Sequence, residues 1–172
     1  MTRRLASYTL ILGLTWLLSA CGFQLRGVGD QGTAVPDEWK IMYLSTGNPN
    51  GEFSREVQTR FAAQGIEWTD RQSANYRLEL GPERFSQRNL SLNAEARVAE
   101  FELTMSARFA VFDADNKVVI KQTEVTTLRQ MENDPRNVVG KAEEIRILKS
   151  EMRADLARQI MRRIGFFAAG NS

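Results

Sequence analysis

An alternation of apolar and polar residues between positions 99 and 111 is the strongest constraint in this sequence. The odd positions carry Ala99, Phe101, Leu103, Met105, Ala107, Phe109 and Val111. The even positions from 100 to 108 carry charged or hydroxyl side chains. Successive side chains of a strand point to opposite faces of a sheet, so this period of two predicts one long strand with a buried face and a solvated face.

Shorter patterns on either side predict three further strands. Residues 39–44 form a short apolar run, and residues 76–80 alternate apolar with charged side chains. Residues 117–128 are rich in Val, Ile and Thr, and they follow a turn sequence, DADN, at 113–116. Runs of this kind that are bounded by turn residues are typical of strands.

Two segments have helical periodicity. Phe53, Val57 and Phe61 recur every four residues, with Asn50 as the predicted N-cap and Gly65 as the C-terminal glycine. The second segment covers about 138–164. Its apolar residues keep a four-residue spacing at Leu148, Met152, Leu156, Ile160 and Ile164.

The element order is therefore strand, helix, three strands, helix. A strand-helix-strand start predicts a parallel crossover, and hairpins join the later strands. We expect an α+β fold, a two-layer sandwich of a four-stranded mixed sheet with two helices on one face. The other face should be more polar.

The first twenty residues have the order of a secretory signal. A positive region (Arg3 and Arg4) precedes an apolar stretch from about position 5 to 18, and small residues follow. The stretch is shorter than the roughly 20 residues that a membrane-spanning helix needs. We therefore expect residues 1–20 to be a signal peptide.

The only cysteine, Cys21, ends this segment in the sequence LSAC. This sequence resembles the lipobox of bacterial lipoproteins, which predicts that Cys21 receives a lipid. Two or more acyl chains give stable membrane anchoring. Residues 21–37 then form a lipidated N-terminus and tether, rich in Gly, Asp and Pro, before a domain at 38–167 and a short tail at 168–172.

Charge and composition exclude several functions. The chain has 23 Lys and Arg against 21 Asp and Glu, and two of its arginines belong to the signal peptide, which leaves 21 against 21. A balanced charge gives no case for a nucleic-acid partner. The chain has no histidine, which removes the usual general base and most zinc sites. We expect no enzyme activity, no catalytic residue, no cofactor and no metal.

Carboxylate pairs at Glu100/Glu102 and Glu143/Glu144 leave a carboxylate hydrolase as a weaker alternative. Basic residues gather in two regions, 81–100 and the final helix. They fit either a solvated surface or an anionic ligand. Lys141 lies near a helix start, where backbone N–H groups also favour an anion. Lipopolysaccharide (LPS) carries phosphates beside acyl chains, so a basic site beside Phe85, Leu90 and Leu92 would suit it.

The sequence after the cysteine, CGFQLRG at 21–27, resembles the mature start of the LptE (RlpB) family of LPS-assembly lipoproteins. The segments 48–57, 99–103 and 133–164 resemble its first loop and helix, its central strand and its closing helix. The resemblance implies an α+β lipoprotein of the outer membrane that binds LPS and helps its insertion at the cell surface. It also implies LPS contacts at Lys141, Arg97 and Arg88.

The resemblance further implies a 1:1 complex with the LptD β-barrel, on the periplasmic side within the barrel lumen. There the protein would plug the barrel and assist its assembly. The alternative is a solitary lipoprotein that faces the periplasm and binds another anionic envelope ligand.

Overall fold

The alternating segment forms strand β5 (Val98–Asp113), as predicted. Its odd-numbered side chains from Phe101 to Val111 are all buried, and none is more than 8% exposed. Fully burying a large apolar side chain contributes about 1.5–3 kcal/mol. This strand therefore supplies the central row of the hydrophobic core.

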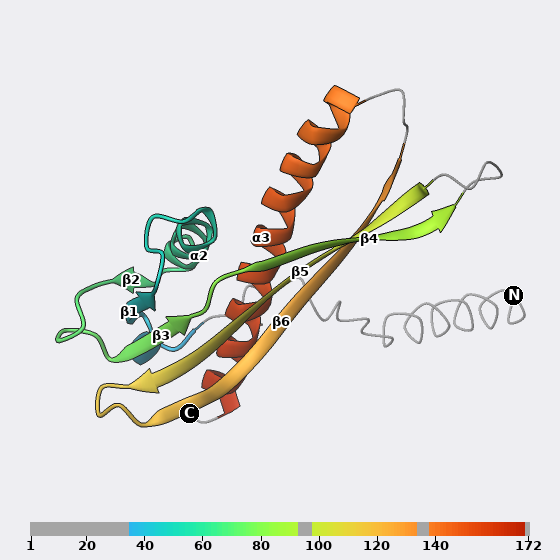
Figure 1. Cartoon of the computed structure of the whole chain (residues 1–172). Helices are drawn as coiled ribbons and strands as arrows, with labels where there is room; N and C mark the ends of the chain where they lie inside the picture. The colour runs from blue at the N-terminus through green and yellow to red at the C-terminus, as the bar shows by residue number, and fades with distance from the viewer. Residues whose placement is uncertain (1–34, 93–97, 134–137, 171–172) are drawn as a thin grey trace, which may run out of the picture. The chain divides into compact units, whose positions relative to one another are not determined.

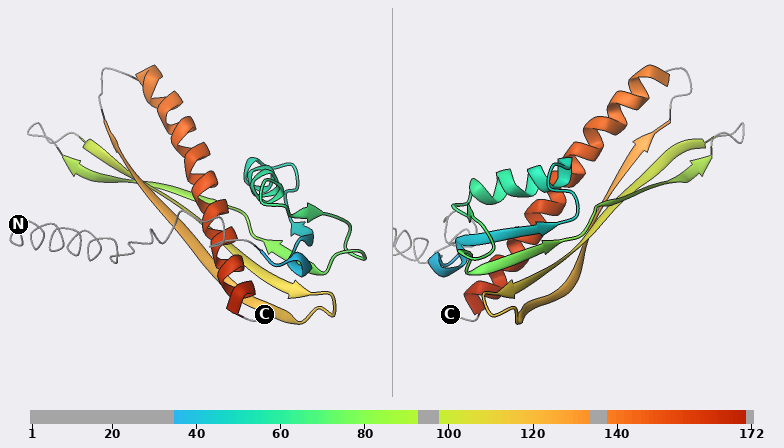
Figure 2. Two further views of the ribbon diagram at one scale, coloured as in Figure 1. Left: turned by 180° about the vertical axis from the view of Figure 1, so that it is seen from behind. Right: turned by 60° about the vertical axis from the view of Figure 1, so that its left-hand side comes forward.

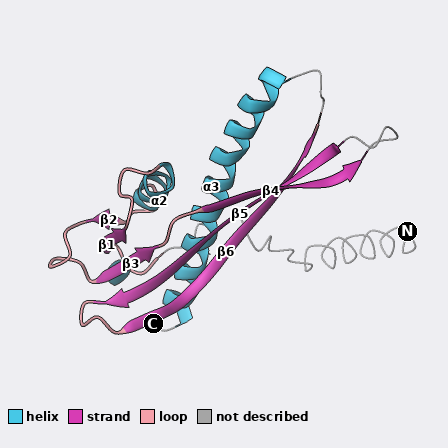
Figure 3. Ribbon diagram, in the orientation of Figure 1, coloured by secondary structure: helices cyan, strands magenta, loops and turns pink. Residues whose placement is uncertain are grey.

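The computed structural model describes residues 35–92, 98–133 and 138–170. In chain order the other elements are η1 (Asp37–Trp39), β1 (Ile41–Thr46), α2 (Glu52–Ala62), β2 (Glu67–Trp68), β3 (Tyr76–Leu80), β4 (Arg84–Leu92), β6 (Val118–Glu132) and α3 (Val138–Gly170). Within these residues, six strands form one sheet (Figures 1 and 3).

The sheet is mixed. Strand β1 pairs in parallel with β2 and β3, which confirms the expected crossover through α2. Strands β3 and β4 pair antiparallel with successive parts of one edge of β5, and β6 pairs with the other edge. Between β3 and β4 the Gly81 N–H donates to the Arg108 carbonyl at 2.8 Å. A side chain at Gly81 would place its Cβ 3.2 Å from that oxygen, so glycine suits this close approach.

Both helices lie on one face of the sheet, and α2 packs against α3 (Figure 2). Phe53, Val57 and Phe61 of α2 are buried, as the four-residue spacing predicted. Met152, Leu156, Ile160 and Ile164 of α3 are fully buried in the same core. The two-layer α+β class is confirmed.

The predicted number of strands is wrong, because β2 and β4 were not expected. Strand β2 has only two residues, too few to show a period. In β4, the positions opposite Met105, Leu103 and Phe101 are Phe85, Gln87 and Asn89. Only one of these three is apolar, so β4 does not show the alternation of a half-buried strand.

Several element ends also differ from the prediction. Trp39 belongs to η1 rather than to β1, and its buried ring stacks on Tyr76 with 3.9 Å between centroids. Gly51, not Asn50, is the N-cap of α2, because a turn closes first through the Gly51 N–H and the Asn48 carbonyl at 3.1 Å. Helix α3 continues beyond Ile164 to Gly170. Gly65 has φ of +85°, which confirms the C-terminal glycine.

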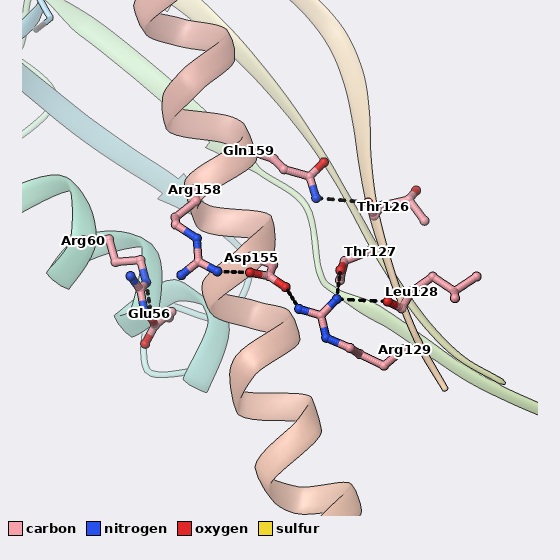
Figure 4. Close-up of polar contacts among 9 residues, drawn as sticks. All are labelled: Glu56, Arg60, Thr126, Thr127, Leu128, Arg129, Asp155, Arg158 and Gln159. Atoms are coloured by element: carbon pink, nitrogen blue, oxygen red, sulfur yellow. Dashed lines mark hydrogen bonds and ion pairs between the residues drawn. The ribbon is translucent and has the colours of Figure 1, made fainter. Parts of the chain in front are cut away.

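Polar contacts fasten α3 to β6 (Figure 4). Asp155 accepts hydrogen bonds from Arg129 of β6 and from Arg158 of its own helix. Gln159 donates to the Thr126 carbonyl at 3.0 Å, and Arg129 donates to the Leu128 carbonyl at 3.0 Å. The bonds from Arg129 to Asp155 and from Gln159 to Thr126 join the two elements, so they fix the position of α3 and of the lysines in its first half.

Candidate functional site

The first half of α3 faces the strands through a stripe of half-buried side chains. The stripe consists of Lys141, Ile145, Leu148 and Lys149, which are spaced to lie on one side of a helix. Ile145 and Leu148 pack against the hydrophobic core. The two lysines lie over Phe101 of β5 and Phe85 of β4. We call these six residues the seam.

Lys141 is held at the seam by two contacts. Its Nζ lies 4.2 Å from the centroid of the Phe101 ring, and it donates to the side-chain oxygen of Asn133. The Asn133 side chain donates to the Val98 carbonyl at 2.6 Å, and its backbone N–H donates to the Ala99 carbonyl at 2.8 Å. Asn133 thus ties the end of β6 to the start of β5 and orients the ammonium group above an aromatic ring.

Lys149 repeats this arrangement further along the helix. Its Nζ lies 4.1 Å from the centroid of the Phe85 ring. The two lysines are eight positions apart, which corresponds to about 12 Å along the helix axis. In such a cation–π pair the aliphatic stem covers apolar surface while the charged end stays near water. The seam therefore presents two cations beside an apolar surface.

Arg88 of β4 lies directly opposite Glu102 of β5. Its Nε donates to the Glu102 carboxylate. The Arg88 side chain is 69% exposed, whereas the Glu102 side chain is 10% exposed. The hydrogen bond from Arg88 lowers the pKa of Glu102, and the same bond raises the pKa of Arg88. Glu102 is therefore ionised at neutral pH and balances the charge of Arg88.

Arg88 and Lys141 lie at the same end of the sheet but on opposite faces. Their partners, Glu102 and Phe101, are neighbours in β5, and neighbouring strand residues point to opposite sides. The other two predicted site residues, Cys21 and Arg97, lie outside the described residues.

In the Glu100/Glu102 pair of the hydrolase alternative, both carboxylates are engaged. Glu100 accepts a hydrogen bond from the Ser91 hydroxyl at 2.8 Å, and Glu102 is held ionised by Arg88. A glycosidase acid must keep its proton near neutral pH, which requires a raised pKa rather than a lowered one. The state of Glu102 is opposite to that requirement.

The described residues contain no group of three or more His, Cys, Asp or Glu side chains placed to hold a metal ion. Among the helices they include, none is long and apolar enough to cross a membrane.

Sequence reasoning did not assign a role to Lys149, Phe101 or Asn133. For Lys149 and Phe101 the sequence held a pattern that could have indicated a place in the site. Lys149 lies two helical turns from Lys141, and Phe101 belongs to the apolar row of β5, which faces the helices. Asn133 had none, because its part depends on a contact between β6 and β5 that only the folded chain brings together.

A family comparison bears on this arrangement. The family model LptE, described as lipopolysaccharide-assembly, matches residues 39–164 of the chain. That range covers most of the sequence, including β5, β6 and the seam. The chain belongs to the LptE family.

Proteins named LPS-assembly lipoprotein LptE are similar to this LptE family member over almost its whole length. The protein from Photorhabdus laumondii is 29% identical over 158 residues, covering 91% of this chain and 84% of the relative. The protein from Pectobacterium atrosepticum is 26% identical over 161 residues, with the same two coverages. These relatives place the chain among the LPS-assembly lipoproteins.

Solved structures of the family share this fold. The crystal structure of rare lipoprotein B from Shewanella oneidensis matches with a TM-score of 0.67 and 26% identity, over 75% of this chain and 96% of that one. The solution structure of a lipoprotein B from Nitrosomonas europaea matches with a TM-score of 0.70 and 22% identity, over 86% and 93%. The second likeness concerns the fold alone.

Proposed function

We propose that this LptE family member binds lipopolysaccharide at the seam and assists its insertion at the cell surface. The observation that carries the proposal is the Lys141 ammonium group above the Phe101 ring, 4.2 Å from its centroid. A cation beside apolar side chains suits a ligand whose phosphates lie next to acyl chains. Arg88 and Arg97 are proposed as further contacts, with Arg88 acting from the opposite face of the sheet.

The proposal includes a lipid anchor at Cys21 in the outer membrane. Residues 1–20 would be removed as a signal peptide, and residues 21–37 would tether the domain. The domain was expected at 38–167 with a short tail at 168–172, but helix α3 extends it to Gly170. The sequence LSAC and the lipoprotein names of the relatives support this organisation.

We further propose a 1:1 complex with the LptD β-barrel, in which this chain plugs the barrel from the periplasmic side and assists its assembly. The polar outer face of β5 supports this role, since side chains such as Thr104 and Arg108 suit a hydrated lumen. The equal numbers of basic and acidic residues after position 20 also fit that environment.

The LPS site is tested with Lys141→Asp. We expect LPS affinity to fall about tenfold or more, because a carboxylate replaces the cation that faces the phosphate. The matched control is Lys117→Asp, since the Lys117 side chain is 77% exposed in the turn between β5 and β6. Unchanged LPS affinity in a folded Lys141→Asp protein would exclude this site.

The partner is tested by purifying the protein from its own outer membrane in a mild detergent. A large β-barrel in a 1:1 ratio is the expected result. A protein that purifies alone yet still binds LPS would support the solitary lipoprotein instead. Loss of membrane attachment in Cys21→Ala is expected from the anchor, and normal fractionation of that variant would contradict it.

A further inference from the structure

A polar groove of about 420 Å³ lies between α2 and α3. Each helix contributes four side chains spaced i, i+3, i+4 and i+7, so the groove is lined by two facing helical stripes. The residues are Glu52, Arg55, Glu56 and Thr59 on α2, and Arg146, Lys149, Ser150 and Arg153 on α3. Packed helices usually meet through apolar stripes. Here the facing stripes are polar, so the groove is suited to a polar ligand.

The cations of this groove outnumber its carboxylates by four to two. Both carboxylates have a partner. Glu52 pairs with Arg153 at 2.8 Å, and Glu56 accepts a hydrogen bond from Arg60, which lies outside the groove lining. Arg153 also pairs with Glu83, which lies outside the lining, at 3.1 Å. The excess of positive charge in the groove therefore comes from cations that have no carboxylate partner in the part of the chain that the structure describes.

Two cations of the groove have no carboxylate partner among the described residues. The Arg55 guanidinium has neither a hydrogen bond nor an ion pair there, and the Lys149 ammonium lies over the Phe85 ring. Arg146 is held by Glu143 through bonds of 2.8 and 2.6 Å, and hydrogen bonding to Glu143 raises the pKa of Arg146. Arg55 and Lys149 are therefore the side chains best placed to receive an anion.

We propose that the α2–α3 groove binds a phosphorylated saccharide. Guanidinium and ammonium groups recognise phosphate by charge and hydrogen bonding. Carboxylates accept hydrogen bonds from sugar hydroxyls, and the hydroxyls of Thr59 and Ser150 can donate or accept. Glu52 and Glu56 each keep acceptor positions beyond their arginine partners, and a bare phosphate would use neither these nor both hydroxyls. The mixture of groups therefore favours a sugar that carries phosphate.

Lys149 connects this groove with the seam. Its Nζ lies over Phe85 at the seam, and the same side chain lines the groove. This inference rests on the proposed function, in which the seam takes the phosphates and acyl chains of LPS. The adjoining groove then holds the phosphorylated sugars of the same molecule, and Lys149 contacts the ligand at the junction.

The test is calorimetric titration of the full-length chain in detergent with a phosphorylated oligosaccharide released from LPS and freed of acyl chains. We expect the unmodified protein to bind it and Arg55→Gln to bind about fivefold or more weakly, because one charge-assisted contact is lost. Arg162→Gln is the matched control, since Arg162 is exposed on α3 outside the groove. Equal binding by Arg55→Gln and Arg162→Gln would overturn the proposal.

Two further arms identify the ligand chemistry. The dephosphorylated oligosaccharide should bind at least fivefold more weakly than the phosphorylated one, and inorganic phosphate should compete only weakly. Full competition by inorganic phosphate at equal concentration would reduce the groove to a simple anion site and contradict the saccharide assignment.

The same variants separate this inference from the proposed function. If intact LPS binds and Lys141→Asp weakens it, but the oligosaccharide does not bind, the groove assignment fails and the seam remains. If LPS does not bind but the oligosaccharide binds in a manner that depends on Arg55, the seam assignment fails and the groove remains.

Discussion

The two halves of α3 have the same apolar period but different surroundings. In the second half, Met152, Leu156, Ile160 and Ile164 are fully buried. In the first half, Leu148 continues the four-residue spacing yet is only half-buried, as are Ile145 and both lysines of the seam. The same helical pattern therefore forms a dry core at one end and a partly hydrated surface at the other.

The strands under the helix explain this difference. The second half of α3 lies in a core that also includes Leu78 of β3 and Phe109 of β5. The first half lies where β5 pairs with β4, whose positions opposite the buried row of β5 include Gln87 and Asn89. Amide side chains cannot complete a dry core without hydrogen-bond partners. The end of the sheet where β4 pairs with β5 is thus suited to bind a ligand rather than to stabilise the fold.

The largest expected effect comes from the same substitution in each half of the helix. Leu156→Ala should lower the free energy of unfolding by about 3 kcal/mol, because the side chain is fully buried and its removal leaves a cavity. Leu148→Ala should cost roughly 1 kcal/mol, because water can enter the partly exposed site. Urea unfolding followed by circular dichroism measures both. Equal losses would remove the distinction between the two halves.

The next effect concerns the polar fastening of the second half. Asp155→Ala should lower the free energy of unfolding by about 1–2 kcal/mol, because Arg129 and Arg158 both lose a charged acceptor. Glu151→Ala is the control, since Glu151 is exposed on the same helix. Urea unfolding in which these two variants have the same stability would show that the contact with β6 contributes nothing measurable.

A smaller effect on stability is expected at the seam. Lys141→Met should change the free energy of unfolding by about 1 kcal/mol or less, because the cation–π contact of a half-buried lysine is weak and the Met side chain still covers the Phe101 ring. The same substitution should weaken LPS binding severalfold. Thermal unfolding and LPS titration of one preparation test both statements. A Lys141→Met protein that is much less stable but binds LPS normally would contradict both expectations.

The smallest effect is a pH dependence of the stability that the pair of Arg88 in β4 and Glu102 in β5 contributes. Arg88 lowers the pKa of Glu102 below its ordinary value of 4.5, so this contribution to stability is present above that value and disappears as the pH falls through the lowered pKa. Arg88→Gln should therefore be less stable than the unmodified chain at pH 7, and the difference should shrink toward pH 3. Urea unfolding at both pH values tests this, and a difference that grows on acidification would contradict it.

The sequence was sufficient to predict the elements whose burial is periodic along the chain. The alternation in β5 and the four-residue spacing in both helices predicted the layers, because periodic burial is visible in the order of residues. The parallel crossover followed from the element order alone. The family, too, followed from short motifs and their order along the chain.

The site was less predictable, because it depends on contacts between distant segments. Lys141 and Arg88 were both expected near the ligand, but only the strand register places them on opposite faces of the sheet. The edge strand β4 was not predicted, because its polar residues break the alternation that identifies a half-buried strand. The groove between α2 and α3 joins residues almost a hundred positions apart, such as Arg55 and Lys149, and no local pattern reports that pairing.

The hydrogen bonds that α3 makes with β6 also bear on solubility. Among the described strands β6 pairs only with β5, so it is an edge strand, and its Thr126 carbonyl accepts a hydrogen bond from Gln159 of α3. An open strand edge is a template for aggregation through pairing with a strand of another molecule. By engaging one backbone acceptor of this edge strand and packing against it, the helix opposes edge-to-edge aggregation before the protein meets any partner.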